Sequence, residues 1–256
     1  MPKPLLHPHQ SPEELTQHVA ERMFRCLEQT LADKGYAHLS LTGGSMGIAT
    51  LAAFAQLPTL RSLDFSRVHF WWSDERFLSR GDQQRNEQQA KDVLLNSLSM
   101  PASNLHTMGA SDQFASAAEA AAAYAAELKA AGGQGKLPVF DLTLLGMGPD
   151  GHIASLFPGR PHIQDRSDSI AQAVLDSPKP PPERVTLLLP VINRSERIWF
   201  LLSGQDKADA LAQLLEAAKL REDELTSQLL DKIPAAGARA RQETLIFATA
   251  DALTHP

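Results

Sequence analysis

Two side chains that can move a proton, Asp150 and His152, lie in a glycine-rich stretch, GMGPDGH, at residues 146–152. Histidine is the only residue whose ordinary pKa lies near neutrality, so His152 is the natural general base. Asp150 could orient the imidazole or bind a substrate hydroxyl, and the sequence leaves both roles open. An apolar run at 139–145 comes before the glycines and predicts a buried strand. A tight turn that carries a surface histidine is the alternative interpretation.

A second charged group follows another apolar run, at residues 67–72, and consists of Asp74, Glu75 and Arg76. Arg76 would offer a fixed cation with forked donors to an oxyanion or a phosphate. Asp74 and Glu75 would then hold the guanidinium in place. The alternative is that all three are solvated turn residues.

Two further passages run from a predicted strand through glycine into a predicted helix. The first contains Gly43, Gly44 and Ser45, and this arrangement aims backbone N–H groups and a helix dipole at a phosphate. In the second, Lys207 stands in the first helical turn, where a lysine is unfavourable unless an anion binds beside it. Snorkelling at the helix edge would explain Lys207 equally well. Neither passage has the Walker lysine pattern or the full dinucleotide fingerprint, so nucleotide binding is not indicated.

The first glycine passage also fits G-x-S-x-G, the nucleophile elbow of serine hydrolases, through Gly43, Ser45 and Gly47. That elbow normally follows several strands, one of which supplies half of the oxyanion hole. Here it follows the first strand predicted by the pattern. The serine hydrolase is therefore kept only as an alternative.

The elements that must position these residues alternate between strands and helices. This alternation predicts an α/β fold with three α/β/α layers and a largely parallel central sheet, whose strands end at one edge near the ligand. We expect residues 1–10 to form a flexible N-terminus and residues 11–256 to form a single α/β domain. The predicted helices cover 12–34, 48–57, 86–98, 111–131, 153–157, 208–218 and 224–230, and the predicted strands cover 38–42, 67–72, 139–145, 169–174, 185–189, 197–202 and 243–248, with an edge strand or linker at 104–108.

Composition narrows the class of protein. The 256 residues are 43% hydrophobic, enough for a sizeable core, and the net charge is −6 with both signs interspersed. This balance argues against a general nucleic-acid binder but not against a local basic pocket. The only cysteine, Cys26, allows neither an internal disulfide nor a cysteine-based zinc site. No stretch reads as a signal peptide or a membrane span, so we expect a cytoplasmic protein without a membrane partner. The pattern leaves monomer and homodimer open.

Several segments, in chain order, resemble the bacterial 6-phosphogluconolactonases over nearly the full length. They are Thr42-Gly43-Gly44-Ser45, Asp74-Glu75-Arg76, GMGPDGHIASLFPG at 146–159, PPPERVTLLLP at 181–190 and SGQDKADAL at 203–211. The resemblance implies a NagB/RpiA-like fold and no metal or other cofactor. It also implies hydrolysis of 6-phospho-D-glucono-1,5-lactone to 6-phosphogluconate in the pentose phosphate pathway.

The same resemblance implies roles for individual residues. His152 would be the base, and Arg76 would be the electrostatic partner of the reacting group. In the mechanism that we expect for a lactone, Arg76 and backbone N–H groups near 148–151 would stabilise the oxyanion. The substrate and phosphate contacts would come from Gly43, Gly44, Ser45, Asp74, Arg184 and Lys207.

The chain departs from the family pattern at two places. It has Met46-Gly47 where the family often has Thr-Pro, and Arg85 where the family often has a serine before the asparagine at 86. Two other functions stay open as alternatives: a deaminase and a non-catalytic sensor. A glucosamine-6-phosphate deaminase would typically carry Asp-Glu-Tyr and Asn-Gly-His, whereas this chain has Asp-Glu-Arg and Asp-Gly-His. A sugar-phosphate sensor would bind without turnover.

Overall fold

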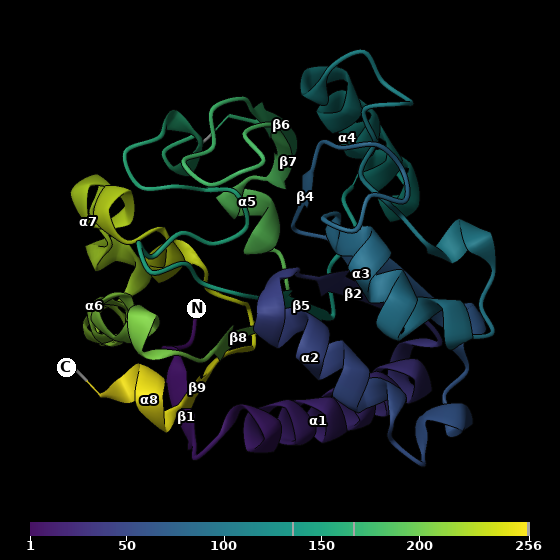
Figure 1. Cartoon of the computed structure of the whole chain (residues 1–256), viewed down its shortest axis with the longest axis horizontal. Coiled ribbons are helices and arrows are strands. Elements are labelled where there is room, and N and C mark those ends of the chain that lie inside the picture. The colour runs from purple at the N-terminus through teal and green to yellow at the C-terminus, as the bar shows by residue number, and fades with distance from the viewer. Residues whose placement is uncertain (135, 166, 255–256) are drawn as a thin grey trace.

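A six-stranded parallel sheet forms the centre of the computed structural model, which describes residues 1–134, 136–165 and 167–254 (Figure 1). The strand order is β1-β9-β8-β5-β2-β3, and all five neighbouring pairs are parallel. The strands are β1 (Leu5–His9), β2 (Ala37–Leu41), β3 (Val68–Trp72), β5 (Leu142–Leu145), β8 (Arg197–Leu202) and β9 (Glu243–Thr249).

Helices cover both faces of this sheet, which confirms the predicted three-layer α/β/α class. Successive residues of β8 alternate between two separate apolar clusters: Trp199 and Leu201 join one, whereas Phe200 and Leu202 join the other. This is the period of two expected for a strand buried on both faces. The first cluster includes α1 (Pro12–Lys34), α2 (Gly44–Ala55) and α3 (Asn86–Val93), and the second includes α4 (Ala117–Gly132), α5 (Leu189–Ile192), α6 (Ala208–Ala218), α7 (Ser227–Lys232) and α8 (Ala250–Leu253).

A second, antiparallel sheet of three strands was not predicted. It has the order β4-β7-β6 and consists of β4 (Asp74–Arg76), β7 (Arg184–Leu187) and β6 (Ala171–Val174). The strand-like runs at 169–174 and 185–189 are strands, but they pair with each other and with β4 rather than with the central sheet. Because Arg76 is opposite Arg184 in this register, the small sheet brings two predicted site residues together.

The N-terminal segment is an edge strand, so the prediction of a frayed tail over residues 1–10 is wrong for residues 5–9. Its backbone pairs with β9 from Leu5 opposite Leu245 to His9 opposite Thr249. Without β1, the polar backbone of β9 would be the open edge of the sheet. Pro8 is tolerated because an edge strand need not donate from every residue.

Several other local elements differ from their predictions. The long alanine-rich helix begins at Ala117 instead of 111, because the Ser116 side chain accepts from the backbone N–H of Glu119 and caps it. The segment at 153–157 is a turn rather than a helix, with Ala154 at φ 47°. Residues 104–108 form no strand apart from a single bridge to β3. The first helix runs as predicted from its Ser11 cap to Gly35.

The order of the strands reverses between β2 and β5. From β2 the chain moves outward to β3, and from β5 it moves the other way to β8 and β9. The loops that follow β2 and β5 therefore separate at their carboxyl ends, and open α/β sheets bind ligands in the crevice formed there. The backbone N–H of Gly146 donates to the Thr42 hydroxyl (3.4 Å), which joins the two loops at the base of this crevice.

Candidate active site

A cavity of about 260 Å³ lies at this switch point and gathers most of the predicted site residues. It is lined by Gly43, Gly44, Asp74, Arg76, His152, Arg184 and Lys207, all predicted to belong to the site. Two predicted residues are placed differently. Asp150 reaches the cavity through its contact with His152, and Ser45 lines an adjoining groove together with Gly44 and Arg76.

The imidazole of His152 is paired with the carboxylate of Asp150. The distance between His152 Nδ1 and Asp150 Oδ1 is 2.5 Å. A carboxylate can only accept in this contact, so the proton of a neutral imidazole lies on Nδ1 and the lone pair lies on Nε2. Among the described residues, no protein group hydrogen-bonds to Nε2. The pair therefore presents an oriented proton acceptor to the cavity.

The carboxylate of Asp150 stays ionised over the whole physiological range. Its partial burial by itself favours the neutral form, but the hydrogen bond and the charge of His152 outweigh burial, and Lys179 adds to them. The result is a pKa of Asp150 lowered to about 2. Lys179 Nζ lies 3.8 Å from Asp150 Oδ1.

Glycine is required twice in the loop that carries this pair. A Cβ at Gly148 would lie 2.1 Å from both Nδ1 and Cε1 of His152. Gly151 has φ +79°, which disfavours other residues, and a Cβ there would lie 2.2 Å from Ile233 Cδ1. The N–H of Gly148 donates to the carbonyl of His152 and the N–H of Gly151 to that of Gly148, both at 2.9 Å. Both N–H groups therefore form hydrogen bonds within the loop, contrary to the expectation that they face an oxyanion.

Arg76 lines the cavity, but its carboxylate neighbours do not hold its guanidinium as predicted. One guanidinium nitrogen, Nη1, donates to the carbonyl of Gln84, and Nε is buried without a protein partner among the described residues. Asp74 instead accepts a hydrogen bond from the Ser155 hydroxyl at 2.7 Å. With no carboxylate bound to it, the Arg76 guanidinium keeps its charge available for an anionic group.

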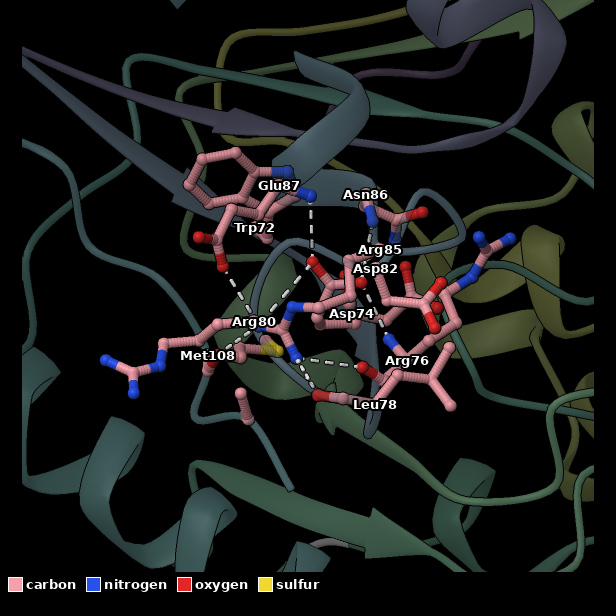
Figure 2. Close-up of polar contacts among 12 residues, drawn as sticks. Trp72, Asp74, Arg76, Leu78, Arg80, Asp82, Arg85, Asn86, Glu87 and Met108 are labelled. Carbon is pink, nitrogen blue, oxygen red and sulfur yellow. Dashed lines mark hydrogen bonds and ion pairs between the residues drawn. The ribbon is translucent and has the colours of Figure 1, made fainter. Parts of the chain in front are cut away.

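The carboxylate of Glu75 binds backbone N–H groups rather than the side chain of Arg76. It accepts from the N–H groups of Arg76 (2.7 Å), Asn86 (2.7 Å) and Glu87 (2.8 Å), so it caps the start of α3. Figure 2 shows Arg76, Asn86 and Glu87 with the polar contacts around them. Burial raises the pKa of Glu75 to about 7, against the opposing effects of Arg85 and the three N–H groups.

The raised pKa of Glu75 makes the free energy of unfolding depend on pH in a direction that can be measured. A folded-state pKa above the ordinary 4.5 makes the folded protein bind the extra proton. The stability that comes from the protonated carboxyl is therefore complete below pH 4.5 and is lost as the pH rises through 7. We expect the free energy of unfolding of the wild type, relative to that of Glu75→Gln, to fall by up to roughly 3 kcal/mol across this window. Urea unfolding at pH 4.5, 6 and 8 measures it, and a constant difference between the two proteins would contradict it.

Arg184 lines the cavity, but most of its N–H groups donate to carbonyls of the proline-rich loop. Its Nη2 donates to the carbonyls of Lys179 (3.0 Å) and Pro180 (3.2 Å), and its Nε donates to that of Pro181 (3.2 Å). Only Nη1 faces the site, 3.9 Å from Asp74 Oδ2. Burial lowers the pKa of Arg184, and Asp74 opposes that effect. Arg184 thus holds the proline loop that brings Lys179 to the cavity.

The start of α2 forms another part of the cavity wall. Gly43 is the residue before the helix and forms no side-chain cap, and a Cβ there would lie 1.8 Å from Asn86 Oδ1. The predicted glycine turn is therefore itself the first turn of α2, whose first amides and dipole face the cavity. Lys207 also lines the cavity, with Nζ 2.9 Å from Asp206 Oδ2.

Sequence reasoning missed the three residues with polar side chains that complete the lining of the cavity: Thr42, Asn86 and Lys179. The only signal for Lys179 was a single cation within a proline run, and the signal for Asn86 was its place at the start of a helix. With Lys179, the cavity has four cationic side chains against the carboxylates of Asp74 and Asp150. Such a balance attracts an anionic ligand.

Ser45 does not have the partners of a nucleophile elbow. It is exposed in the first turn of α2, and no hydrogen bond joins it to a histidine within the described part of the chain. Without a base to activate it, a serine hydroxyl is a weak nucleophile. The geometry does not support the serine hydrolase alternative.

Comparison with known proteins agrees with the resemblance in the sequence. Residues 10–247 match the family of glucosamine-6-phosphate isomerases/6-phosphogluconolactonase. A 6-phosphogluconolactonase of Streptomyces coelicolor is 41% identical over 247 residues, covering 94% of this chain and 90% of that protein. The crystal structure of a 6-phosphogluconolactonase from Thermotoga maritima has a TM-score of 0.79 and 26% identity, covering 96% of this chain and 100% of that one.

The fold is shared more widely than this. A monomeric glucosamine-6-phosphate deaminase of the NagB superfamily superposes with a TM-score of 0.76 at 21% identity, covering 98% of this chain and 100% of that chain. At that identity the similarity speaks for the fold alone, so the family rests on the match over residues 10–247 and on the 41% identical relative. The chain belongs to the glucosamine-6-phosphate isomerase/6-phosphogluconolactonase family.

Proposed function

We propose that this protein hydrolyses 6-phospho-D-glucono-1,5-lactone to 6-phospho-D-gluconate, a step of the pentose phosphate pathway. The observation that carries the proposal is the oriented pair of His152 and Asp150 in a cavity that also contains Arg76 and Lys207. The relatives named 6-phosphogluconolactonase support it. A lactone needs a base for water and a cation for the carbonyl oxygen, and its phosphate needs an anion site.

In the first step, His152 Nε2 takes a proton from water while the water oxygen bonds to the lactone carbonyl carbon. The electron pair of the carbonyl moves onto its oxygen, and Arg76 stabilises this negative charge. In the second step, the oxyanion re-forms the carbonyl as the bond from that carbon to the ring oxygen breaks, and the ring oxygen takes the proton back from His152. The new carboxylic acid then releases its proton to water, which gives 6-phosphogluconate. A positioned base typically contributes about 10²–10⁴ in rate, and one well-placed oxyanion donor contributes about 3–4 kcal/mol.

The phosphate binds at the other end of the cavity. Lys207 and the first amides of α2 form that end, and a dianion suits both the lysine and the positive end of a helix dipole. This binding energy is remote from the reacting carbon and serves to orient the lactone. Asp74, which keeps one oxygen free of the Ser155 hydroxyl, is the acceptor for a sugar hydroxyl.

The direct test follows the decay of freshly made 6-phosphogluconolactone with and without the protein, against the spontaneous hydrolysis. We expect strong acceleration that depends on protein concentration. Decay at the spontaneous rate would reject the proposal. Release of ammonia from glucosamine 6-phosphate would favour the deaminase instead, and binding of 6-phosphogluconate without turnover would favour a sensor.

Gly148→Ala tests whether the loop positions the base. The new methyl group would overlap the imidazole of His152, so the imidazole must move by about an ångström. A displacement of that size can cost about 10²-fold in rate. We expect kcat to fall by roughly that factor while the thermal midpoint changes by only a few degrees. Gly237→Ala is the matched control, since a Cβ there would also overlap a neighbouring side chain, 2.5 Å from Leu189 Cδ2, but Gly237 does not line the cavity. Equal kcat values for the two variants would contradict the prediction.

A further inference from the structure

We propose that Arg85 is a positioning residue for Arg76: it fixes the backbone from which the Arg76 guanidinium enters the cavity. The inference rests on the proposed function of the site. Arg85 immediately precedes α3, does not line the cavity, and is only 1% exposed. Figure 2 shows its guanidinium among the carbonyls of the loop that joins β4 to α3.

The guanidinium of Arg85 connects three segments of the chain. Its Nη1 donates to the carbonyls of Arg76 (3.0 Å) and Leu78 (3.2 Å), just beyond the end of β4. Its Nη2 donates to the carbonyl of Met108 (2.6 Å), in the linker before α4, and to Glu87 Oε2 (2.9 Å), in α3. One buried side chain thereby joins the end of β4, the loop after it and the linker before α4. The Arg76 and Leu78 carbonyls also accept from the N–H groups of Leu78 (2.9 Å) and Ser111 (3.0 Å), so Arg85 adds a second donor to each.

Arg76 is the last residue of β4, so Arg85 holds its backbone at the point where the strand passes into the loop. Its backbone N–H donates to Glu75 Oε1 at 2.7 Å, and its carbonyl accepts from Arg85 Nη1 (3.0 Å) and from the N–H of Leu78 (2.9 Å), so the residue is held from both sides. Within the described part of the chain, the guanidinium has one acceptor, the carbonyl of Gln84, which lies in the same loop. Movement of the loop backbone would therefore carry the Arg76 cation away from the reacting oxygen.

The charge of Arg85 is compensated within the cluster, which is what permits its burial. Glu87 lies at 2.9 Å and Glu75 at 4.0 Å, and Glu87 also pairs with Lys91 at 2.5 Å. A lysine at position 85 would keep the charge but not the planar fork, and its ammonium cannot reach four acceptors spread over three segments. Arg85→Lys thus separates the geometry of the residue from its charge.

The chain offers a matched control in Arg239. It is also 1% exposed and donates to two backbone carbonyls, those of Leu220 (2.7 Å) and Ala217 (2.8 Å) at the end of α6, away from the cavity. We expect Arg85→Lys and Arg239→Lys to lower the thermal midpoint by similar amounts. Only Arg85→Lys should lower kcat, by about 10- to 100-fold, with KM changed less than threefold. Equal kcat values for the two variants, measured well below both midpoints, would overturn the proposal.

A double-mutant cycle with Arg76→Ala distinguishes positioning from general loosening. If Arg85 acts through Arg76, Arg85→Lys should lower kcat by less than twofold in the Arg76→Ala background. Fully multiplicative effects would overturn the proposal. If Arg85→Lys does not fold, the isosteric Glu87→Gln, which removes the charged acceptor of Nη2, replaces it in the same cycle with an expected loss of about 3- to 10-fold.

A readout that needs no turnover keeps this proposal separate from the proposed function. In spectra of ¹⁵N-arginine-labelled protein, the Arg76 Nε–H signal is assigned by its loss in Arg76→Ala. We expect that signal to shift or broaden in Arg85→Lys and to stay in place in Arg239→Lys. An unchanged Arg76 signal in Arg85→Lys would overturn the positioning role even if the protein proved not to hydrolyse the lactone.

Discussion

Replacing His152 by alanine is expected to lower kcat for lactone hydrolysis by about two to four powers of ten, while affinity for 6-phosphogluconate changes only a few-fold. The reason is the separation of tasks in the cavity. The imidazole is an oriented proton acceptor paired with the Asp150 carboxylate, whereas the phosphate contacts that we propose come from Lys207 and the start of α2. Initial rates corrected for spontaneous hydrolysis give kcat, and calorimetry gives the affinity for the product.

His162→Ala is the control for this experiment. His162 is also partly buried, but its Nε2 contacts the carbonyl of Ala173 at 3.1 Å and it does not line the cavity. Its removal should leave kcat within about twofold. A His152→Ala variant that retains more than a tenth of the wild-type kcat would show that another group activates the water.

The parallel sheet could be predicted because its signals are local. A strand buried on both faces has a short apolar run, and the glycine that ends it appears at the next residues, as in β5 and the loop after it. The resemblance to the family, carried by motifs after such strands, is confirmed by the comparisons. The small antiparallel sheet could not be predicted, because the period of a strand does not say which partner it pairs with.

The turn at 153–157 shows how tertiary contacts override a helical pattern. Ala154 has φ 47°, which an apolar helical pattern does not predict. The next residue is anchored at both its backbone and its side chain: the Ser155 N–H donates to Thr186 Oγ1 (3.3 Å) and the hydroxyl donates to Asp74 (2.7 Å). Both partners come from the antiparallel sheet. Because the pairing of that sheet could not be predicted, the turn could not be predicted either.

Positions in the site were easier to predict than roles. Charged residues directly after strands had to lie at the carboxyl edge, and seven of the predicted residues do line one cavity. Their partners, however, are set by distances between segments far apart in the chain. Arg184 binds three carbonyls of the proline loop, and Glu75 binds three backbone N–H groups, neither of which follows from residue type. Arg85, where the chain departs from the family pattern, does not line the cavity. Its guanidinium binds the backbone carbonyl of Arg76 instead.

Asp150→Asn is expected to lower kcat by about two to three powers of ten. An asparagine can turn its NH₂ group toward Nδ1 of His152, which then accepts, and the imidazole proton moves to Nε2. In that tautomer Nε2 cannot take a proton from water. The pKa of Asp150, lowered to about 2, means that the wild-type carboxylate is ionised wherever the enzyme is assayed, so no change of pH within the physiological range should restore the variant.

The double variant decides between the two roles that the sequence left open for Asp150. If the carboxylate acts through the imidazole, as the 2.5 Å contact indicates, Asp150→Asn should cost almost nothing further once His152 is alanine. If the carboxylate instead binds a hydroxyl of the substrate, the two losses should multiply and KM should rise with Asp150→Asn alone.

Lys179 offers a third variant for this test, because its Nζ lies 3.8 Å from the same oxygen of Asp150. Lys179→Met removes a charge that supports the ionised carboxylate but leaves the contact with His152, so its kcat should fall far less than that of Asp150→Asn.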